Sequence, residues 1–522
     1  GHALNLAIKT VGLDLEARAA RTTGELHEIL LATAEIATDP AISEEAAGFI
    51  ASGHTASYAM VKATEVFQEL LTASGGYLAE RVSDVANIRD RVLCEIAGIA
   101  YPEIPHFDVP TVLIAQDLSP ADTADLATDK ILAIVTAGGG PTSHTAIIAR
   151  SNGIAAIVAC PGVVEAASAH AGASVAVDAT TGQITFNPND ALKSEIASKI
   201  ERIKARKSRV ITRSADGYVT TDGTVVPIYA NIGRLEDTVA AVAAGADGVG
   251  LLRTELLYLD RNDAPTLQEQ TAIYTQLFTP FNGQKVIIRT LDAGADKPMA
   301  FINFAQEPNP ALGVRGYRTI DGHEDLLRTQ LQAIANAAKA TTAEVWVMAP
   351  MVTLPGEAAA FVSMAREYGL NKAGVMIEVP AAIFHADEIT KVCDFVSIGT
   401  NDLGQYLHAA DRESAALASF NDPWQPALLR AVHLVAQAGI KNNCPVGVCG
   451  EAASDAALAS VLVGLGVSSL SCSVATLTDV AQAVTAHSLQ QLVRAGNVAI
   501  AANTALDAKN SARSQLVELA QL

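Results

Sequence analysis

Gly248-Val-Gly-Leu-Leu-Arg-Thr-Glu255 is a short apolar run that contains an arginine, and it is one of about eight such runs after residue 215. Segments with helical spacing separate them. The runs span 225–232, 248–253, 285–290, 345–350, 374–379, 395–399, 445–449 and 468–472. Eight strands that alternate with helices are the repeat of a (β/α)8 barrel. The pattern therefore predicts a TIM-type barrel over residues 214–522.

Polar side chains stand at the C-terminal ends of five of these runs. They are Arg253, Arg289, Glu378, the pair Asn401 and Asp402, and Cys449. In a barrel the C-terminal ends of all strands meet at one rim, where the catalytic residues of this fold lie. A structural ion pair would explain any one of these residues, but it explains the whole set poorly. We therefore expect a single site at the C-terminal rim.

The residue types at this rim fit an anionic substrate and a hard metal ion. Arg253 and Arg289 can bind carboxylate and phosphate groups in bidentate fashion, and Arg412 adds a third positive charge. Glu378 and Asp402 offer carboxylate oxygens, and two carboxylates completed by substrate phosphate and water form a common Mg²⁺ site.

A second chemically distinct stretch, residues 138–150, reads GGGPTSHTAIIAR and follows the apolar run 130–136. The order predicts a strand, a glycine turn and a helix, with His144 at the helix N-terminus. The partial positive charge and unpaired amides of a helix start would disfavour a cationic imidazole and would hold an attached phosphoryl group. From the local pattern alone, a solvent-exposed turn histidine explains His144 equally well.

The remaining segments complete a multidomain chain. An α-helical bundle is expected over 1–98 and a small α/β domain over 99–190. A charged linker helix follows over 191–213, and the barrel occupies 214–522. The expected strands of the α/β domain are 109–115, 131–136, 154–159, 173–178 and 183–186.

Composition excludes several classes of protein. The net charge of −20 over 522 residues argues against nucleic acid as a bulk partner. No run of 18 apolar residues and no basic-then-apolar leader occurs, which predicts neither a membrane span nor a signal peptide. Six scattered cysteines are typical of reduced thiols in a cytoplasm.

Several motifs resemble a known family in sequence and in order. GGPTSHTAIIAR resembles the phosphohistidine motif shared by enzyme I of the phosphoenolpyruvate:sugar phosphotransferase system, pyruvate phosphate dikinase and phosphoenolpyruvate synthase. The barrel motifs are similar to those of enzyme I across about 300 residues. These motifs are GVGLLRTE, PTLQEQ, NPALGVRGYR, GVMIEVPAA, SIGTNDLGQY, ADR and VCGE.

The resemblance to enzyme I implies a role for each matching residue. His144 would be phosphorylated, Cys449 would donate a proton, and Glu378 with Asp402 would bind Mg²⁺. The implied phosphoenolpyruvate contacts are Arg253, Arg289, Asn401, Asp402 and Arg412, with Lys297 and Arg315 as further contacts. The resemblance also implies docking of the phosphocarrier protein HPr on the helical domain and a homodimer formed through the barrel.

Two positions depart from the family pattern, and three alternative interpretations remain. Pro141 stands where many enzyme I sequences have arginine, and Val379 replaces a threonine. The chain could be a dikinase or synthase relative that lacks its ATP domain, although no P-loop pattern occurs, or a sensor that binds phosphoenolpyruvate without chemistry. Cys444 and Cys449 could instead share a zinc ion, although no second pair of ligands lies near them in the sequence.

Overall fold

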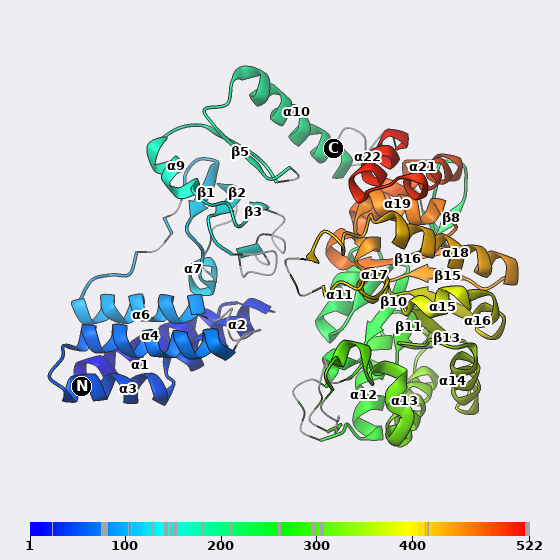
Figure 1. Cartoon of the computed structure of the whole chain (residues 1–522), viewed down its shortest axis with the longest axis horizontal. Coiled ribbons are helices and arrows are strands. Elements are labelled where there is room, and N and C mark those ends of the chain that lie inside the picture. Colours follow the sequence, from blue (N-terminus) through cyan, green and yellow to red (C-terminus); the bar gives the residue numbers. More distant parts are fainter. Residues whose placement is uncertain are drawn as a thin grey trace. The chain divides into compact units, whose positions relative to one another are not determined.

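The chain forms two compact units, Gly1–Glu201 and Arg202–Leu522, and the boundary between them falls within one long helix (Figure 1). The structure is a computed structural model. It describes residues 1–22, 25–74, 82–102, 104–105, 107–124, 126, 130–139, 145–146, 149, 154–179, 181–207, 211, 213–258, 261, 263–294, 299, 301–302, 307–412, 414 and 417–516.

The first unit begins with a helical bundle, as the sequence predicts. Its helices are α1 (His2–Ala19), α2 (Glu25–Ala37), α3 (Pro40–Ala51), α4 (Ala56–Ser74) and α6 (Val82–Ala97). Leu15, Leu30 and Met60 lie in one buried core that the helices share. A new helix begins at Pro40, because the Asp39 side chain accepts a hydrogen bond from the Ala41 amide at 2.8 Å and caps α3.

An α/β region completes the first unit. A three-stranded parallel sheet has the order β1-β2-β3, and a separate antiparallel hairpin joins β4 and β5. The strands and helices of this region are β1 (Thr111–Ala115), α7 (Pro120–Ala124), β2 (Ile131–Thr136), β3 (Ala155–Ile157), α9 (Val163–Ala169), β4 (Val175–Asp178), β5 (Gln183–Phe186) and α10 (Asp190–Lys207). All five expected strands are therefore present, with shorter bounds in three cases.

One expected strand is wrong in extent. The run 225–232 is divided at Pro227, so that β8 (Val225–Val226) belongs to a small antiparallel sheet with β6 (Arg213–Ser214) and β7 (Gly217–Val219). Only β9 (Ile228–Ile232) enters the barrel. Because proline has no amide hydrogen to donate to a ladder, it marks the point where the chain changes sheets.

The second unit is a closed parallel barrel of eight strands in sequence order, with helices around it (Figure 1). The strands after β9 are β10 (Gly248–Arg253), β11 (Lys285–Arg289), β12 (Glu344–Ala349), β13 (Ala373–Ile377), β14 (Phe395–Ile398), β15 (Val446–Val448) and β16 (Ser469–Ser473). Most of their residues are buried, because one side faces the barrel interior and the other packs on helices. This confirms the predicted TIM-type barrel.

Helices follow most of the strands and cover the barrel. They are α11 (Leu235–Ala243), α12 (Leu267–Phe278), α13 (Ile320–Ala340), α14 (Pro355–Glu367), α15 (Pro380–Phe384), α16 (Ala386–Val392), α17 (Thr400–His408), α18 (Pro426–Asn442), α19 (Ala456–Gly464), α20 (Leu477–Thr485), α21 (Leu489–Ala501) and α22 (Ala505–Gln515). In the described part of the chain, none of the helices combines the length and the apolar character that crossing a bilayer requires.

The close packing of two barrel strands gives a first test. A methyl group at Gly374 of β13 would overlap the backbone carbonyl oxygen of Phe395 in β14, whereas one at Gly356 of α14 would meet no atom within 4 Å. Gly374→Ala should therefore destabilise the barrel by about 1–3 kcal/mol or more, and Gly356→Ala should not destabilise it.

Denaturant unfolding followed by tryptophan fluorescence measures this difference in the second unit alone, because both tryptophans, Trp346 and Trp424, lie in it. Equal unfolding midpoints for Gly374→Ala and the parent protein would show that the strands are not packed as described.

Candidate functional site

The sequence-predicted residues of the barrel gather at its C-terminal rim. Arg253 and Arg289 are the last residues of β10 and β11, and Glu378 directly follows β13. Asn401 and Asp402 lie in the first turn of α17, just after β14, and Cys449 directly follows β15. The rim is built as the strand pattern predicts.

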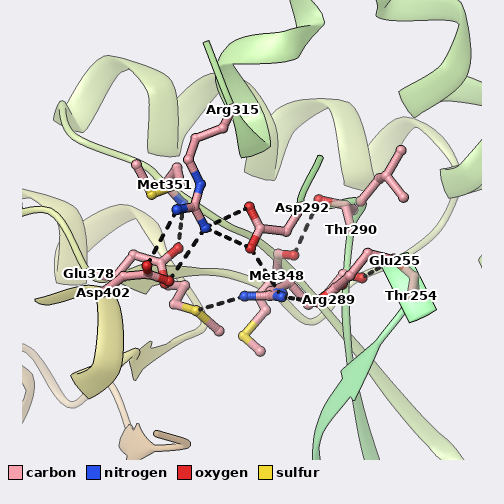
Figure 2. Close-up of polar contacts among 12 residues, drawn as sticks. Thr254, Glu255, Arg289, Thr290, Asp292, Arg315, Met348, Met351, Glu378 and Asp402 are labelled. Atoms are coloured by element: carbon pink, nitrogen blue, oxygen red, sulfur yellow. Dashed lines mark hydrogen bonds and ion pairs between the residues drawn. The ribbon is translucent and has the colours of Figure 1, made fainter. Parts of the chain in front are cut away.

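Arg289 is held at the rim by two carboxylates. Its guanidinium forms a short ion pair with Glu255, and its Nη2 lies 3.2 Å from Oδ2 of Asp292 (Figure 2). The Nη1 atom contacts the sulfur of Met376 at 3.7 Å. All of these charged groups are buried, so the guanidinium is fixed in position before any substrate arrives.

Arg315 lies deeper in the same cluster. Its Nη2 is 3.1 Å from Oδ2 of Asp292, and its Nη1 is 3.3 Å from Oδ1 of Asp402 (Figure 2). A β-bridge between Gly294 and Arg315 fixes the segment that carries the arginine. Arg315 therefore joins the end of β11 to the start of α17, a role that its place in the sequence does not reveal.

Glu378 is positioned by the backbone of a neighbouring turn. Its Oε1 accepts a 2.7 Å hydrogen bond from the amide of Met351, a non-glycine residue with a φ of 59°. Gly399 gives the carboxylate room, because a Cβ there would lie 2.6 Å from Oε2. A left-handed backbone conformation costs conformational energy in a residue that has a side chain, and such strain is concentrated at functional sites.

Among the residues that the structure describes, the buried cluster has more carboxylates than guanidinium groups. Four carboxylates lie near two guanidinium groups; these residues are Glu255, Asp292, Glu378, Asp402, Arg289 and Arg315. Burial, together with the charges of Asp402 and Asp292, raises the pKa of the Glu378 carboxyl to about 8. A cation beside Glu378 and Asp402 would relieve this crowding, so these hard oxygen donors fit Mg²⁺.

Two arginines remain available to a substrate at the rim. Arg253 is half-buried and forms no ion pair with any residue that the structure describes. Arg412 donates its backbone amide to Oε1 of Gln405 at 3.1 Å, and its Nη1 lies 3.9 Å from Oδ1 of Asp402. Both side chains can therefore direct positive charge to an anion.

Cys449 is a protonated thiol in a buried position. Its side chain is 1% exposed, and its sulfur donates to the carbonyl oxygen of Ile398 at 3.6 Å. Burial raises the pKa of the Cys449 thiol to about 11, although Ser397 and two arginines act in the opposite direction. Burial outweighs these effects, which favours the neutral thiol.

The alternative of a shared zinc site has no support. Cys444 and Cys449 lie at opposite ends of β15, a separation of roughly 15 Å along an extended chain. Within the described ranges, no three His, Cys, Asp or Glu side chains form a group that could hold a metal ion. The pair Glu378 and Asp402 falls below that number and would need substrate oxygens and water to complete a site.

Two predicted residues, His144 and Lys297, lie outside the described residues. Of the residues that flank His144, the structure describes 130–139, 145, 146 and 149. β2 ends at Thr136, Gly139 has a φ of 80°, and Thr145 and Ala146 are helical and buried. The end of β2 and the conformation of Gly139 agree with the predicted strand and glycine turn, whereas most of the predicted helix lies outside the described residues.

Sequence reasoning missed two members of the cluster, Glu255 and Asp292. Each follows a strand-end arginine closely, since Glu255 comes two residues after Arg253 and Asp292 three residues after Arg289. An acidic residue so near a predicted substrate arginine was the available signal. The missing information was that both carboxylates contact Arg289.

The raised pKa of Glu378 makes barrel stability depend on pH. In the unfolded chain this carboxyl has a pKa of about 4.3. The folded state binds the proton more tightly, with a pKa of about 8. Stability should therefore fall as the pH rises from about 4.3 to about 8 and should level off above that. The Glu378→Gln variant should lose less stability over this range than the parent.

Denaturant midpoints from tryptophan fluorescence at pH 5 and pH 8, with a metal chelator present, test this expectation. Glu236→Gln serves as the control, because Glu236 is exposed on α11 and should leave the pH dependence unchanged. Parallel behaviour of Glu378→Gln and the parent would show that Glu378 is not the group responsible.

Three family models match the chain in succession. They describe the N-terminal domain of PEP-utilising enzymes over residues 2–81, the mobile domain over 107–182 and the PEP-binding domain over 207–489. The last of these covers more than half of the chain and includes the whole rim cluster.

Curated relatives agree with the family models. A phosphoenolpyruvate-protein phosphotransferase of Streptomyces coelicolor is 44% identical over 512 residues, which cover 98% of this chain and 91% of the relative. One of Haloferax volcanii is 37% identical and covers 90% and 83%, and one of Geobacillus stearothermophilus is 36% identical and covers 81% and 75%. The chain therefore belongs to the PEP-utilising enzyme family, as a member of the phosphoenolpyruvate-protein phosphotransferases.

Proposed function

We propose that the chain transfers the phosphoryl group of phosphoenolpyruvate to His144, releases pyruvate and then passes the group to a histidine of HPr. The observation that carries this proposal is the rim cluster, which combines fixed guanidinium groups with buried carboxylates inside the segment matched by the PEP-binding domain. This transfer is the first step of sugar uptake by the phosphotransferase system.

The arginines bind the two anionic groups of the substrate. Arg289 is oriented by Glu255 and Asp292, while Arg253 and Arg412 approach from other parts of the rim. Charged, bidentate contacts of this kind neutralise a phosphate as it leaves and a developing enolate. Lys297 belongs to the same proposed set.

Asn401 has a donor available for the substrate. Its Oδ1 accepts from the Glu451 amide at 2.8 Å, which fixes the orientation of the side chain. The amide nitrogen can then donate to an oxygen of phosphoenolpyruvate. Arg315 contacts Asp402, so it lies next to any ligand that binds this carboxylate.

Glu378 and Asp402 are the proposed Mg²⁺ ligands. When bound, the ion would supply positive charge to the phosphate and the enolate oxygen, as in other phosphoryl transfers. The chain holds one carboxylate ready through the Met351 amide and the other through Arg315.

Cys449 is the proposed proton donor to the enolate carbon. Its thiol is neutral at physiological pH, because burial raises its pKa to about 11. The S–H bond breaks as a C–H bond forms on the methylene carbon, and pyruvate results. The thiol also stands at the end of β15, on the same rim as the arginines.

The remaining regions of the chain are assigned roles by their resemblance to enzyme I. We assign HPr docking to residues 1–98, the phosphohistidine carrier to 99–190, the linker to 191–213 and the substrate-binding barrel to 214–522. The carrier must bring His144 first to phosphoenolpyruvate, the phosphoryl donor, and then to HPr, the acceptor, since each transfer requires in-line contact. A homodimer through the barrel is part of the proposal, as is a cytoplasmic location.

The carrier assignment predicts a specific loss. His144→Ala should still bind phosphoenolpyruvate with Mg²⁺ but should gain no phosphoryl group, because the acceptor nitrogen is absent. His170→Ala is the matched control, since His170 is an exposed histidine that ends α9 in the same unit. Intact-protein mass spectrometry after incubation with phosphoenolpyruvate and Mg²⁺ measures the gain. An acid-labile phosphoryl group on His144→Ala would contradict the assignment.

The metal assignment predicts coupled losses of binding. Glu378→Gln and Asp402→Asn should each weaken Mg²⁺-dependent phosphoenolpyruvate binding by at least about tenfold, because each removes a buried charged partner. Glu344→Gln is the control, since Glu344 begins β12 at the opposite end of the barrel. Calorimetric titration with and without Mg²⁺ measures both effects. Unchanged, metal-dependent affinity in both rim variants would refute the ligand pair.

A further inference from the structure

The barrel interior contains a cavity that extends from its N-terminal end. Its mouth is formed by the first residues of strands, including Lys285, Phe395 and Ser469, and its inner wall by Ser397 and Gly447. Barrel interiors are usually filled by bulky branched side chains. Here small residues leave a volume of ≈ 30 Å³, which is room for about two water molecules.

Serine side chains line part of the cavity. Ser397 pairs with Gly447 across β14 and β15, and Gly447 pairs with Ser469 across β15 and β16. A Cβ atom at Gly447 would lie 3.0 Å from Oγ of Ser469 and 3.8 Å from Oγ of Ser397. The missing side chain of Gly447 therefore leaves a space that both hydroxyl groups border.

Ser397 connects this space to the rim. The residue is 3% exposed and pairs with Gly447, and Cys449 lies two residues beyond Gly447 in the chain. The Ser397 hydroxyl lies close enough to the thiol to act against the rise in its pKa. At the mouth, the ammonium group of Lys285 stacks over the Trp346 ring, 3.6 Å from its centroid. The cavity thus reaches from the N-terminal end of the barrel to Ser397, which lies beside the buried thiol.

The proposed reaction creates a need for such a route. Each turnover takes the proton from Cys449 and leaves a thiolate that is 1% exposed. The thiol lies among apolar side chains, including Ile287 and Met376, and substrate or product lies on its rim side. A buried thiolate without a proton source would delay the next turnover.

We propose that water in this cavity returns a proton to Cys449 through the hydroxyl of Ser397. The inference rests on the proposed function, in which Cys449 protonates the enolate. The sulfur takes the hydroxyl proton as the Ser397 O–H bond breaks, and the Ser397 oxygen takes a proton from a cavity water. The resulting hydroxide is neutralised by protons from bulk solvent at the N-terminal mouth. Ser397 acts through Cys449 and does not touch the substrate.

Two variants interrupt the route by different means. Ser397→Ala removes the relaying hydroxyl, whereas Gly447→Ala keeps every hydroxyl and fills the space between Ser397 and Ser469. Ser397→Thr retains the hydroxyl and should restore the route. Ser460→Ala is a control for loss of a buried hydroxyl, because Ser460 lies in α19 and donates to the Ala456 carbonyl.

The test follows the hydrogen that Cys449 delivers. Protein equilibrated in H₂O is diluted into D₂O, and after a variable delay a single turnover is started with phosphoenolpyruvate and Mg²⁺. Mass spectrometry of the pyruvate methyl group reports whether protium or deuterium was transferred. Ser397→Ala and Gly447→Ala should retain protium about 10²-fold longer than the parent, while Ser397→Thr and Ser460→Ala should behave as the parent.

Each failure has a separate signature. Protium loss as fast in Ser397→Ala and Gly447→Ala as in the parent would overturn the relay. A Cys449→Ala variant that forms pyruvate as fast as the parent would remove the proton donor on which the relay depends. A parent protein that forms no pyruvate and gains no phosphoryl group would instead contradict the proposed function itself.

Discussion

Within the described part of the barrel rim, buried carboxylates outnumber buried guanidinium groups, and this is the constraint on which the site depends. Among the described residues, the buried carboxylates of Glu255, Asp292, Glu378 and Asp402 lie around the buried guanidinium groups of Arg289 and Arg315. Burial, together with the charges of Asp402 and Asp292, raises the pKa of Glu378 to about 8. Burying unbalanced charge costs several kcal/mol for each ion unless partners compensate it. Such buried charge is expected at a site where a bound cation and a charged substrate compensate it.

The same constraint explains the backbone around the site. Met351 adopts a left-handed conformation and gives its amide to Glu378, and Gly399 leaves the space that the carboxylate occupies. The left-handed Gly316 follows Arg315 directly, and a Cβ there would lie 2.9 Å from Cβ of Met351. The segments that carry Arg315 and Met351 therefore fit together closely. Positions of this kind keep the reacting groups in place before substrate binds.

Much of this arrangement could be predicted from the sequence, because strand periodicity and strand-end chemistry are local signals. The eight barrel strands and the rim positions of Arg253, Arg289, Glu378 and Cys449 followed from them. The contacts of Arg315 could not be predicted from these signals, since its carboxylate partners lie 23 and 87 positions away in the chain. The cavity beside Ser397 was equally hidden, because it depends on which small residues of β14, β15 and β16 meet inside the barrel. Pro227 itself is the sequence signal for the division of the run 225–232, because proline cannot donate to a strand ladder.

The most direct test of the account is the second transfer. The chain is phosphorylated with phosphoenolpyruvate and Mg²⁺, freed of both and mixed with purified HPr, and the masses of both proteins are followed over time. The account predicts that the chain loses one phosphoryl group as HPr gains one, and that this exchange needs no further phosphoenolpyruvate. A chain that keeps its phosphoryl group while HPr remains unmodified would contradict it.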